Sequence, residues 1–140
     1  MADSIPRAYF KELTDTLAAE SLMVALFVDL TGYNTLTATT YAVLADTAQE
    51  VLSSGTGYTT GGYALTGGTS SNLATNGAKF TTASALAVTA ATFTCRYAVI
   101  YNSTTGKIRF IKDLLADKTV TTGTLTITWD TTNGIISFSF

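Results

Sequence analysis

The chain has 140 residues, of which 46% are hydrophobic and only 13% are charged, and its net charge is −2. This length suits one domain, and this hydrophobic content is sufficient for a core, which excludes a globally disordered chain. The eight Lys and Arg residues are scattered along the sequence, so no basic stripe is available to neutralise phosphates, and we expect no nucleic-acid binding.

Threonine dominates the remaining composition and favours strands. It makes up about a fifth of the chain, and its β-branched side chain is stiff at the first torsion, which suits a sheet better than a helix. The composition therefore predicts a mainly β fold. Few charges and many small hydroxyl side chains also give a surface that repels other proteins weakly, which suits a chain that packs in an assembly.

A short helix or arm is predicted at the N-terminus, over residues 5–20, and Pro6 suits its first turn. Its apolar residues recur at helical spacing: Tyr9, Phe10, Leu13 and Leu17. Residues 1–10 lack the apolar core of a signal peptide, and the longest apolar run, 22–28, is too short to span a bilayer. We expect a soluble protein with no membrane partner.

The next part of the chain changes from helical to strand-like patterns. Residues 23–30 are nearly all apolar, as in a strand that is buried on both faces or clamped beneath the helix. Residues 38–44 favour a further strand, and 46–52 fit either a helical turn or a strand. The Gly-rich segment 53–76 lacks the third glycine and the strand–helix context of a phosphate loop, so we expect a long hairpin excursion.

The C-terminal half shows the clearest alternation of apolar and polar residues. Residues 91–101 predict a strand, residues 102–106 a five-residue turn, and residues 107–112 the returning strand. Further along, residues 124–130 alternate again and place Trp129 in the core. The sequence therefore predicts a hairpin followed by at least one more strand.

The last turn and the spacing of the strands suggest the fold class. Asn133-Gly134 is a strong hairpin signal, and it predicts that 124–130 pairs with 136–140. Roughly seven or eight short strands with frequent turns predict an antiparallel β-sandwich or a jelly-roll-like barrel. We divide the chain into an N-terminal helix or arm, residues 1–20, and a β-sandwich domain, residues 21–140.

A search for catalytic chemistry finds little. The chain has no histidine, which removes the commonest general base and a frequent metal ligand. Its single cysteine, Cys95, lies in a predicted strand and is expected to pack in the core. Asp113 and Asp117 lie around an expected turn, and nothing in the sequence brings two acids together as hydrolysis would require. We therefore expect no enzyme activity, no catalytic residue, no cofactor and no metal site.

Four blocks of the sequence resemble a group of small structural proteins from the virions of tailed phages. They are LMVALFVD, SGTGYTTGGYALTG, the RYAVIYNSTTGKIRFI string within residues 91–111, and GTLTITWDTTNGIISFSF, and they follow one another in the same order. The RYAVIYN string followed by a turn is the most specific of them. The resemblance covers most of the chain from residue 22 onward and implies a β-sandwich-like virion component with no catalytic residues to carry over.

The expected function is that of a decoration or cement protein that binds and stabilises the lattice of the major capsid protein. The expected location is the virion, after synthesis in the host cytoplasm, and the expected partners are a homo-oligomer, dimer or trimer, and the major capsid protein or other virion proteins. A tail, neck or head-fibre component is one alternative. A carbohydrate-binding module that uses Tyr33, Tyr58 and Tyr63 as a stacking platform is another.

Partner contacts are expected at the N-terminal arm, at the Gly-rich excursion and at the C-terminal strand. Aromatic and leucine side chains in these segments are the natural anchors of an interface, because they bury large apolar areas on binding. Unpaired edge strands can also accept a strand from another subunit. The candidate interface residues are Tyr9, Phe10, Leu13, Tyr58, Tyr63, Phe138 and Phe140.

Overall fold

The computed structural model describes residues 7–30, 40–73, 77–82 and 85–139, and it divides the chain into two compact units. The helix unit consists of Met1–Glu20, Thr66–Ala85 and Thr128–Phe140, and the hairpin unit consists of Ser21–Leu65 and Leu86–Ile127. Met1–Glu20 does not form a unit by itself, because two later segments of the chain belong to the same unit. Residues 21–140 are therefore shared between both units.

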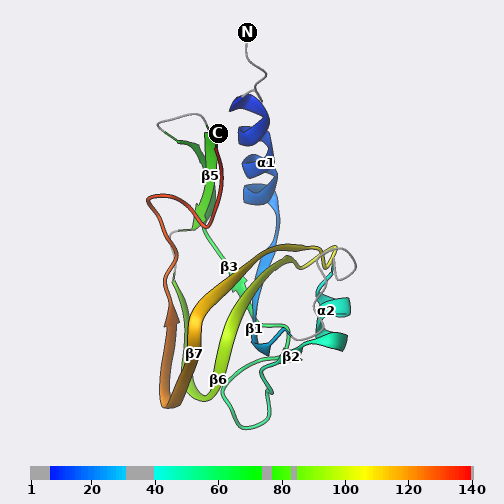
Figure 1. The fold of residues 1–140 in the computed structure, drawn as a ribbon, viewed down its shortest axis with the longest axis vertical. Helices are drawn as coiled ribbons and strands as arrows, with labels where there is room; N and C mark the ends of the chain where they lie inside the picture. The colour runs from blue at the N-terminus through cyan, green and yellow to red at the C-terminus, as the bar shows by residue number, and fades with distance from the viewer. Residues whose placement is uncertain (1–6, 31–39, 74–76, 83–84, 140) are drawn as a thin grey trace. The chain divides into compact units, whose positions relative to one another are not determined.

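The helix unit contains one helix and a three-stranded antiparallel sheet (Figure 1). The helix, α1 (Arg7–Ala19), lies within the predicted range, and its apolar stripe contacts the sheet. Phe10 and Leu17 of this stripe are buried, together with Phe80 of the sheet. The strands lie in the order β4 (Gly68–Asn72), β5 (Gly77–Thr82) and β8 (Ile136–Ser139).

The hairpin unit contains a five-stranded antiparallel sheet, in which β6 and β7 form a long curved hairpin (Figure 1). The order is β2-β1-β6-β7, and β3 shares one edge of β1 with β2. A second helix, α2, precedes β2 in the chain. The elements are β1 (Leu22–Asp29), α2 (Tyr41–Thr47), β2 (Gln49–Glu50), β3 (Tyr63–Leu65), β6 (Leu86–Asn102) and β7 (Ile108–Ile127).

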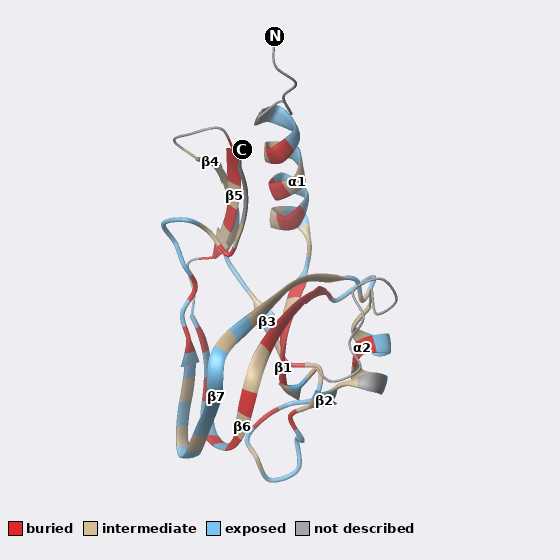
Figure 2. Cartoon of the chain, viewed as in Figure 1, coloured by how far each residue is buried: buried red, intermediate tan, exposed pale blue. Residues whose placement is uncertain are grey.

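The core of the hairpin unit is built on β1, which is buried on both faces as predicted. Ala25 and Phe27 of β1 pack with Val99 and Tyr101 of β6 and with Leu44 of α2. The opposite face buries the alternate residues of β1. Figure 2 shows buried residues along β1 and β6, whereas β7 is mostly exposed or intermediate.

The strand predicted over residues 38–44 is wrong. Residues 38 and 39 lie outside the described part of the chain, and helix α2 begins at Tyr41. Thr40 caps this helix, because its side-chain oxygen accepts a hydrogen bond from the backbone N–H of Val43. Leu44 is fully buried against the sheet, so tertiary packing outweighs the strand preference of this segment.

The last predicted hairpin is also wrong, although its turn is present. The chain turns at residues 131–133, but β8 pairs with β5 and not with the strand that precedes the turn. β7 ends at Ile127, and Trp129 beyond it is buried in the helix unit. A backbone hydrogen bond from Ile135 N–H to the Phe80 oxygen directs the returning chain onto β5.

The fold class is therefore mainly β with antiparallel sheets and a short N-terminal helix, as the composition predicted. The large sheet does not close into a barrel: in the described part of the chain β7 pairs only with β6, and β2 and β3 occupy the other edge. Neither described helix has the length and apolar character required to cross a lipid bilayer.

Candidate functional site

A tyrosine hydroxyl completes the hydrogen bonding of β1 in the hairpin unit. β3 pairs with residues 22–24 of β1, and β2 pairs with Phe27 and Asp29, which leaves a gap between the two short strands. At this gap the backbone N–H of Leu26 donates to the Tyr58 hydroxyl at 3.0 Å, and the Leu26 oxygen accepts from Val51 N–H at 2.9 Å. The Gly-rich segment thereby supplies a partner that no strand provides.

The Glu50 carboxylate connects this segment to α2. Its two oxygens accept hydrogen bonds from the hydroxyls of Tyr58 and Tyr41, each at 2.6 Å, and from the backbone N–H of Gly61 at 2.8 Å. The Tyr41 ring stacks on the Tyr101 ring with centroids 4.5 Å apart, and the Tyr101 hydroxyl donates to the Gly61 oxygen. We call these five residues the Glu50 cluster.

The electrostatics of the Glu50 cluster favour structure over catalysis. Two effects raise the pKa of both Tyr41 and Tyr58 far above that of a free tyrosine. Burial is the larger effect, and the hydrogen bond to Glu50 is the second. Burial also raises the pKa of Tyr101. These phenols are therefore protonated at neutral pH, and they serve as hydrogen-bond donors to the carboxylate rather than as bases or nucleophiles.

Two glycines permit the Gly-rich segment to lie directly on the strands. A Cβ atom on Gly62 would lie 1.8 Å from the backbone oxygen of Val24, and one on Gly57 would lie 2.4 Å from that of Ala90. Both glycines have positive φ angles, which residues with a Cβ atom rarely adopt. The segment is not the long hairpin that was expected, because β3 pairs with β1 and β4 pairs with β5. Its first part is fixed by these close backbone contacts as well as by aromatic packing.

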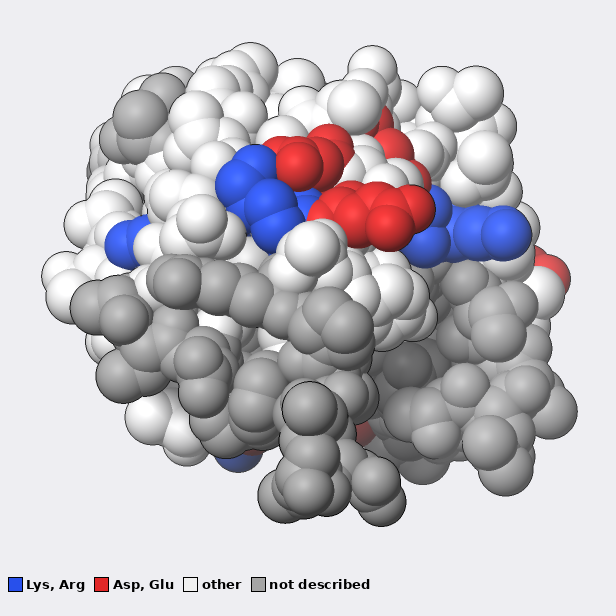
Figure 3. All heavy atoms as spheres, turned by 90° about the horizontal axis from the view of Figure 1, so that it is seen from above, with Lys and Arg blue, Asp and Glu red and all other residues white. Residues whose placement is uncertain are grey.

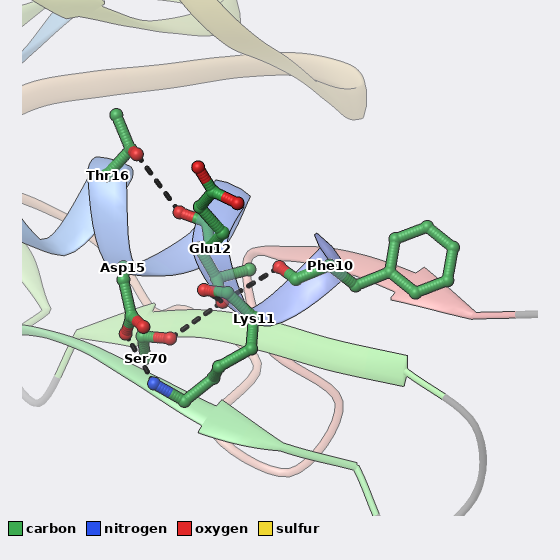
Figure 4. Close-up of polar contacts among 7 residues, drawn as sticks. Phe10, Lys11, Glu12, Asp15, Thr16 and Ser70 are labelled. Carbon is green, nitrogen blue, oxygen red and sulfur yellow. Dashed lines mark hydrogen bonds and ion pairs between the residues drawn. The ribbon is translucent and has the colours of Figure 1, made fainter. Parts of the chain in front are cut away.

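A buried polar contact joins α1 to the sheet of the helix unit. Thr14 has no exposed surface, and its hydroxyl lies 2.6 Å from the hydroxyl of Ser70 on β4, which is labelled in Figure 4. Its Oγ1 also lies 3.0 Å from the backbone oxygen of Lys11. An ion pair between Lys11 and Asp15 lies beside this contact, and Lys11 holds the pKa of Asp15 below its usual value. Thr14 thereby fixes which face of α1 contacts the sheet.

The expected interface residues of α1 have different environments. Tyr9 is 51% exposed and Leu13 is half-buried, whereas Phe10 is buried against the sheet. Phe138 lies opposite Ala78 in the pairing of β8 with β5, and Phe140 lies outside the described residues. Of the residues expected on the arm, Tyr9 offers the largest surface to a partner.

The tyrosines of the Gly-rich segment turn toward the protein. Tyr58 is only 3% exposed, and its ring meets the Tyr63 ring edge-on with centroids 5.8 Å apart. The Tyr63 hydroxyl donates to the backbone oxygen of Gly57 and accepts from Thr59 N–H. Tyr33, the third member of the expected stacking platform, lies outside the described residues. The geometry of Tyr58 and Tyr63 favours packing over sugar stacking.

A bulge in β7 is a surface feature that the sequence reasoning did not anticipate. Cys95 pairs with Lys118 and Tyr97 pairs with Asp113, so three extra residues are accommodated on β7 between these two pairs. Leu115 within this bulge is 84% exposed and has a φ angle of +69°. The signal was present in the Leu-Leu-Ala-Asp string, which interrupts the alternation expected of a strand.

The base of the bulge is held by an ion pair. Arg96 of β6 contacts Asp113 with two nitrogen–oxygen distances of 2.7 and 3.2 Å, and its guanidinium lies over the Tyr97 ring. The Asp113 carboxylate also accepts the backbone N–H of Leu115 at 2.7 Å. The hydrogen bond from the Arg96 guanidinium is the main reason that the pKa of Asp113 lies below its usual value, and the hydrogen bond from the Leu115 N–H is the second.

The remaining residues that could support catalysis or metal binding are the single cysteine and the acidic side chains. Cys95 is buried, and burial raises the pKa of its thiol to about 11. Within the described ranges, no group of three or more acidic or cysteine side chains is arranged to hold a metal ion. On the described surface in Figure 3, basic and acidic side chains lie next to one another, and most of the remainder is uncharged.

Comparisons of this chain with models of protein families, with curated proteins and with solved structures find no match.

Proposed function

We propose that the protein is a structural component of a tailed-phage virion, a decoration or cement protein that binds and stabilises the lattice of the major capsid protein. The observation that carries this proposal is the ordered series of sequence blocks that resemble small virion proteins. Two of these blocks occupy the centre of the hairpin unit: LMVALFVD is β1, and RYAVIYN is the end of β6. They pair in one register, from Leu22 opposite Asn102 to Phe27 opposite Tyr97.

The physical character of the surface supports a role in assembly. The chain has few charges, and β7 exposes many threonines along 20 residues. A capsid lattice repeats the same contact many times, so a small contact area in each copy is sufficient through avidity. The Glu50 cluster and the close glycine contacts also fix the Gly-rich segment before binding, and this lowers the entropy lost on docking.

The proposal includes a homo-oligomer, dimer or trimer, and the sandwich-like virion fold that the resemblance implies. Tyr9, exposed on α1, is the residue of the expected arm with the most surface available to a neighbouring subunit. A tail, neck or head-fibre component is the alternative within the virion, and it shares the same sequence blocks.

The test is the number of copies of this chain in a purified virus particle, measured by quantitative mass spectrometry against the major capsid protein. A copy number in a simple ratio to the capsid subunit supports a decorating role. A copy number that is a small fraction of the capsid subunit moves the protein to the tail, the neck or a fibre. Absence from the particle refutes the proposal.

A further inference from the structure

The turn that precedes β8 contains a chemically labile pair of residues, Asn133 and Gly134. The backbone nitrogen of the residue after an asparagine can attack the asparagine carboxamide, and glycine hinders that attack least because it has no side chain. Asn133 is exposed, so water has access to the product of the attack. The pair is therefore a candidate for deamidation in the folded protein.

The fold does not accept a larger residue at position 134, the change that would slow this reaction. Gly134 has a φ angle of +90°, and a Cβ atom on it would lie 2.8 Å from Lys79 Cβ and 2.9 Å from the Phe80 oxygen. This close approach accompanies the pairing of β8 with β5, because the next residue, Ile135, donates its N–H to the same Phe80 oxygen at 2.8 Å. The labile pair is thus a requirement of the strand pairing.

The Asp130 carboxylate holds the side chain of Asn133. Its Oδ2 accepts a hydrogen bond from Asn133 Nδ2 at 2.9 Å, and its Oδ1 accepts the backbone N–H groups of Thr132 and Asn133, each at 2.9 Å. The backbone hydrogen bond from Asn133 is the main reason that the pKa of Asp130 lies below its usual value, and the side-chain hydrogen bond is the second. Nδ2 is the atom that leaves in deamidation, so the reaction has to break its hydrogen bond to Asp130.

We propose that Asn133 deamidates spontaneously in the native protein, at a rate held down by Asp130, and that the acid formed loosens the pairing of β8 with β5. In the first step the Gly134 nitrogen forms a bond to Asn133 Cγ, and Nδ2 leaves as ammonia with the proton of the Gly134 N–H. Water then opens the cyclic imide at one of its two carbonyl groups, which gives aspartate or isoaspartate. The inference does not depend on the proposed function, because it concerns the chemistry of the isolated chain.

The product places a second negative charge beside Asp130. A carboxylate oxygen replaces the amide donor, and like charges at this separation repel each other. Lys79 favours the ionised form of Asp130, but its amine already donates to the backbone oxygens of Thr131 and Thr132. Isoaspartate also adds one carbon atom to the main chain immediately before β8. Both products therefore weaken the turn that directs β8 onto β5.

The first test follows deamidation of the full chain in ¹⁸O-labelled water at mildly alkaline pH. Trypsin releases residues 119–140 as one peptide, because Lys118 is the last basic residue, and Asn133 is the only asparagine in this peptide. The other Asn-Gly pair, at residues 76–77, falls in a different peptide. The native chain is expected to gain one labelled oxygen in peptide 119–140, and the chain unfolded in guanidinium chloride to gain it at least ~5-fold faster.

A variant isolates the contribution of the carboxylate. Asp130→Ala is expected to raise the native rate at least ~5-fold without changing the rate in guanidinium chloride. Asp117→Ala, at another exposed aspartate, is the matched control and should leave the native rate unchanged. The comparison of native and unfolded wild-type chains still decides the matter if Asp130→Ala does not fold. A native chain that gains no label while the unfolded chain converts, equal rates for these two chains, or equal native rates for the two variants would overturn the proposal.

The second test measures the effect of the product on β8. Asn133→Asp carries the new charge, and Asn133→Ser is the neutral control that also lacks the carboxamide. Hydrogen exchange of the Ile135 amide, which donates to the Phe80 oxygen, is expected to be at least ~5-fold faster in Asn133→Asp than in Asn133→Ser. The fluorescence of Trp129, the only tryptophan of the chain and the neighbour of Asp130, reports on the same turn. Equal exchange rates in the two variants would refute the loosening of β8.

Discussion

Replacing Tyr58 by Phe tests whether a side-chain hydroxyl stands in for a missing strand beside β1. The substitution keeps the ring and removes only the oxygen that accepts the Leu26 N–H and donates to Glu50. Leu26 is completely buried, so its N–H loses its partner without access to water. An unsatisfied buried donor costs about 1–3 kcal/mol, and the lost bond to a carboxylate adds about 1 kcal/mol, because Glu50 keeps its other two donors.

The expected loss is therefore about 3 kcal/mol of unfolding free energy, a large part of the roughly 5–15 kcal/mol typical of a domain. Urea denaturation followed by far-ultraviolet circular dichroism measures it as a shift of the midpoint by about 1–2 M. Tyr63→Phe is the matched control: its hydroxyl bonds exposed backbone groups that water can satisfy, so it should cost less than about 1 kcal/mol. Equal losses for the two variants would refute the role assigned to Tyr58.

Three further predictions follow from close contacts and charges. Gly62→Ala would place a methyl group 1.8 Å from a backbone oxygen of β1 and is expected to lower the melting temperature by more than 10 °C or to prevent folding, at a cost of several kcal/mol. Gly55→Ala, also at positive φ but with nothing within 4 Å, should cost only about 1 kcal/mol, and similar melting temperatures would contradict the reasoning. Thr14→Val removes the buried partner of the Ser70 hydroxyl, which keeps its hydrogen bond to Asp15, and should cost about 1 kcal/mol in urea denaturation, whereas the exposed control Thr16→Val should change the free energy by less than about 0.5 kcal/mol. The pKa of Asp113 is held below its usual value of 3.8, so its contribution to stability is complete above pH 3.8 and is lost as the pH falls through the lower folded value. Asp113→Asn should therefore reduce the acid dependence of the melting temperature between about pH 2 and pH 6, and an unchanged profile would show that the ion pair contributes nothing.

The predictions that succeeded depend on local patterns. The helical spacing of Phe10 and Leu17 predicts α1, and the apolar run from residue 23 predicts a strand buried on both faces. The alternation over residues 91–101 and the turn after Asn102 predict the hairpin of β6 and β7. In each case the pattern and the buried face lie within one element or two neighbouring elements, so the sequence alone carries the information.

The features that the sequence did not predict depend on partners that are distant along the chain. The Asn133-Gly134 turn indicates a reversal, but only the packed structure pairs β8 with β5, because the register is chosen by which apolar face is buried. Helix α2 forms where a strand was expected, since Leu44 is buried on the large sheet. The Glu50 cluster joins residues from four segments, and no spacing rule places them together.

The bulge of β7 could be predicted only in part from the sequence. The Leu-Leu-Ala-Asp string departs from strand alternation, and the sequence indicates a turn around Asp113 and Asp117. The folded chain instead continues as one strand, accommodates the extra residues in a bulge and leaves Leu115 in solvent. The reason is that β6 continues without a break past this point, and its pairing with β7 on both sides of the bulge outweighs the turn preference of the three extra residues.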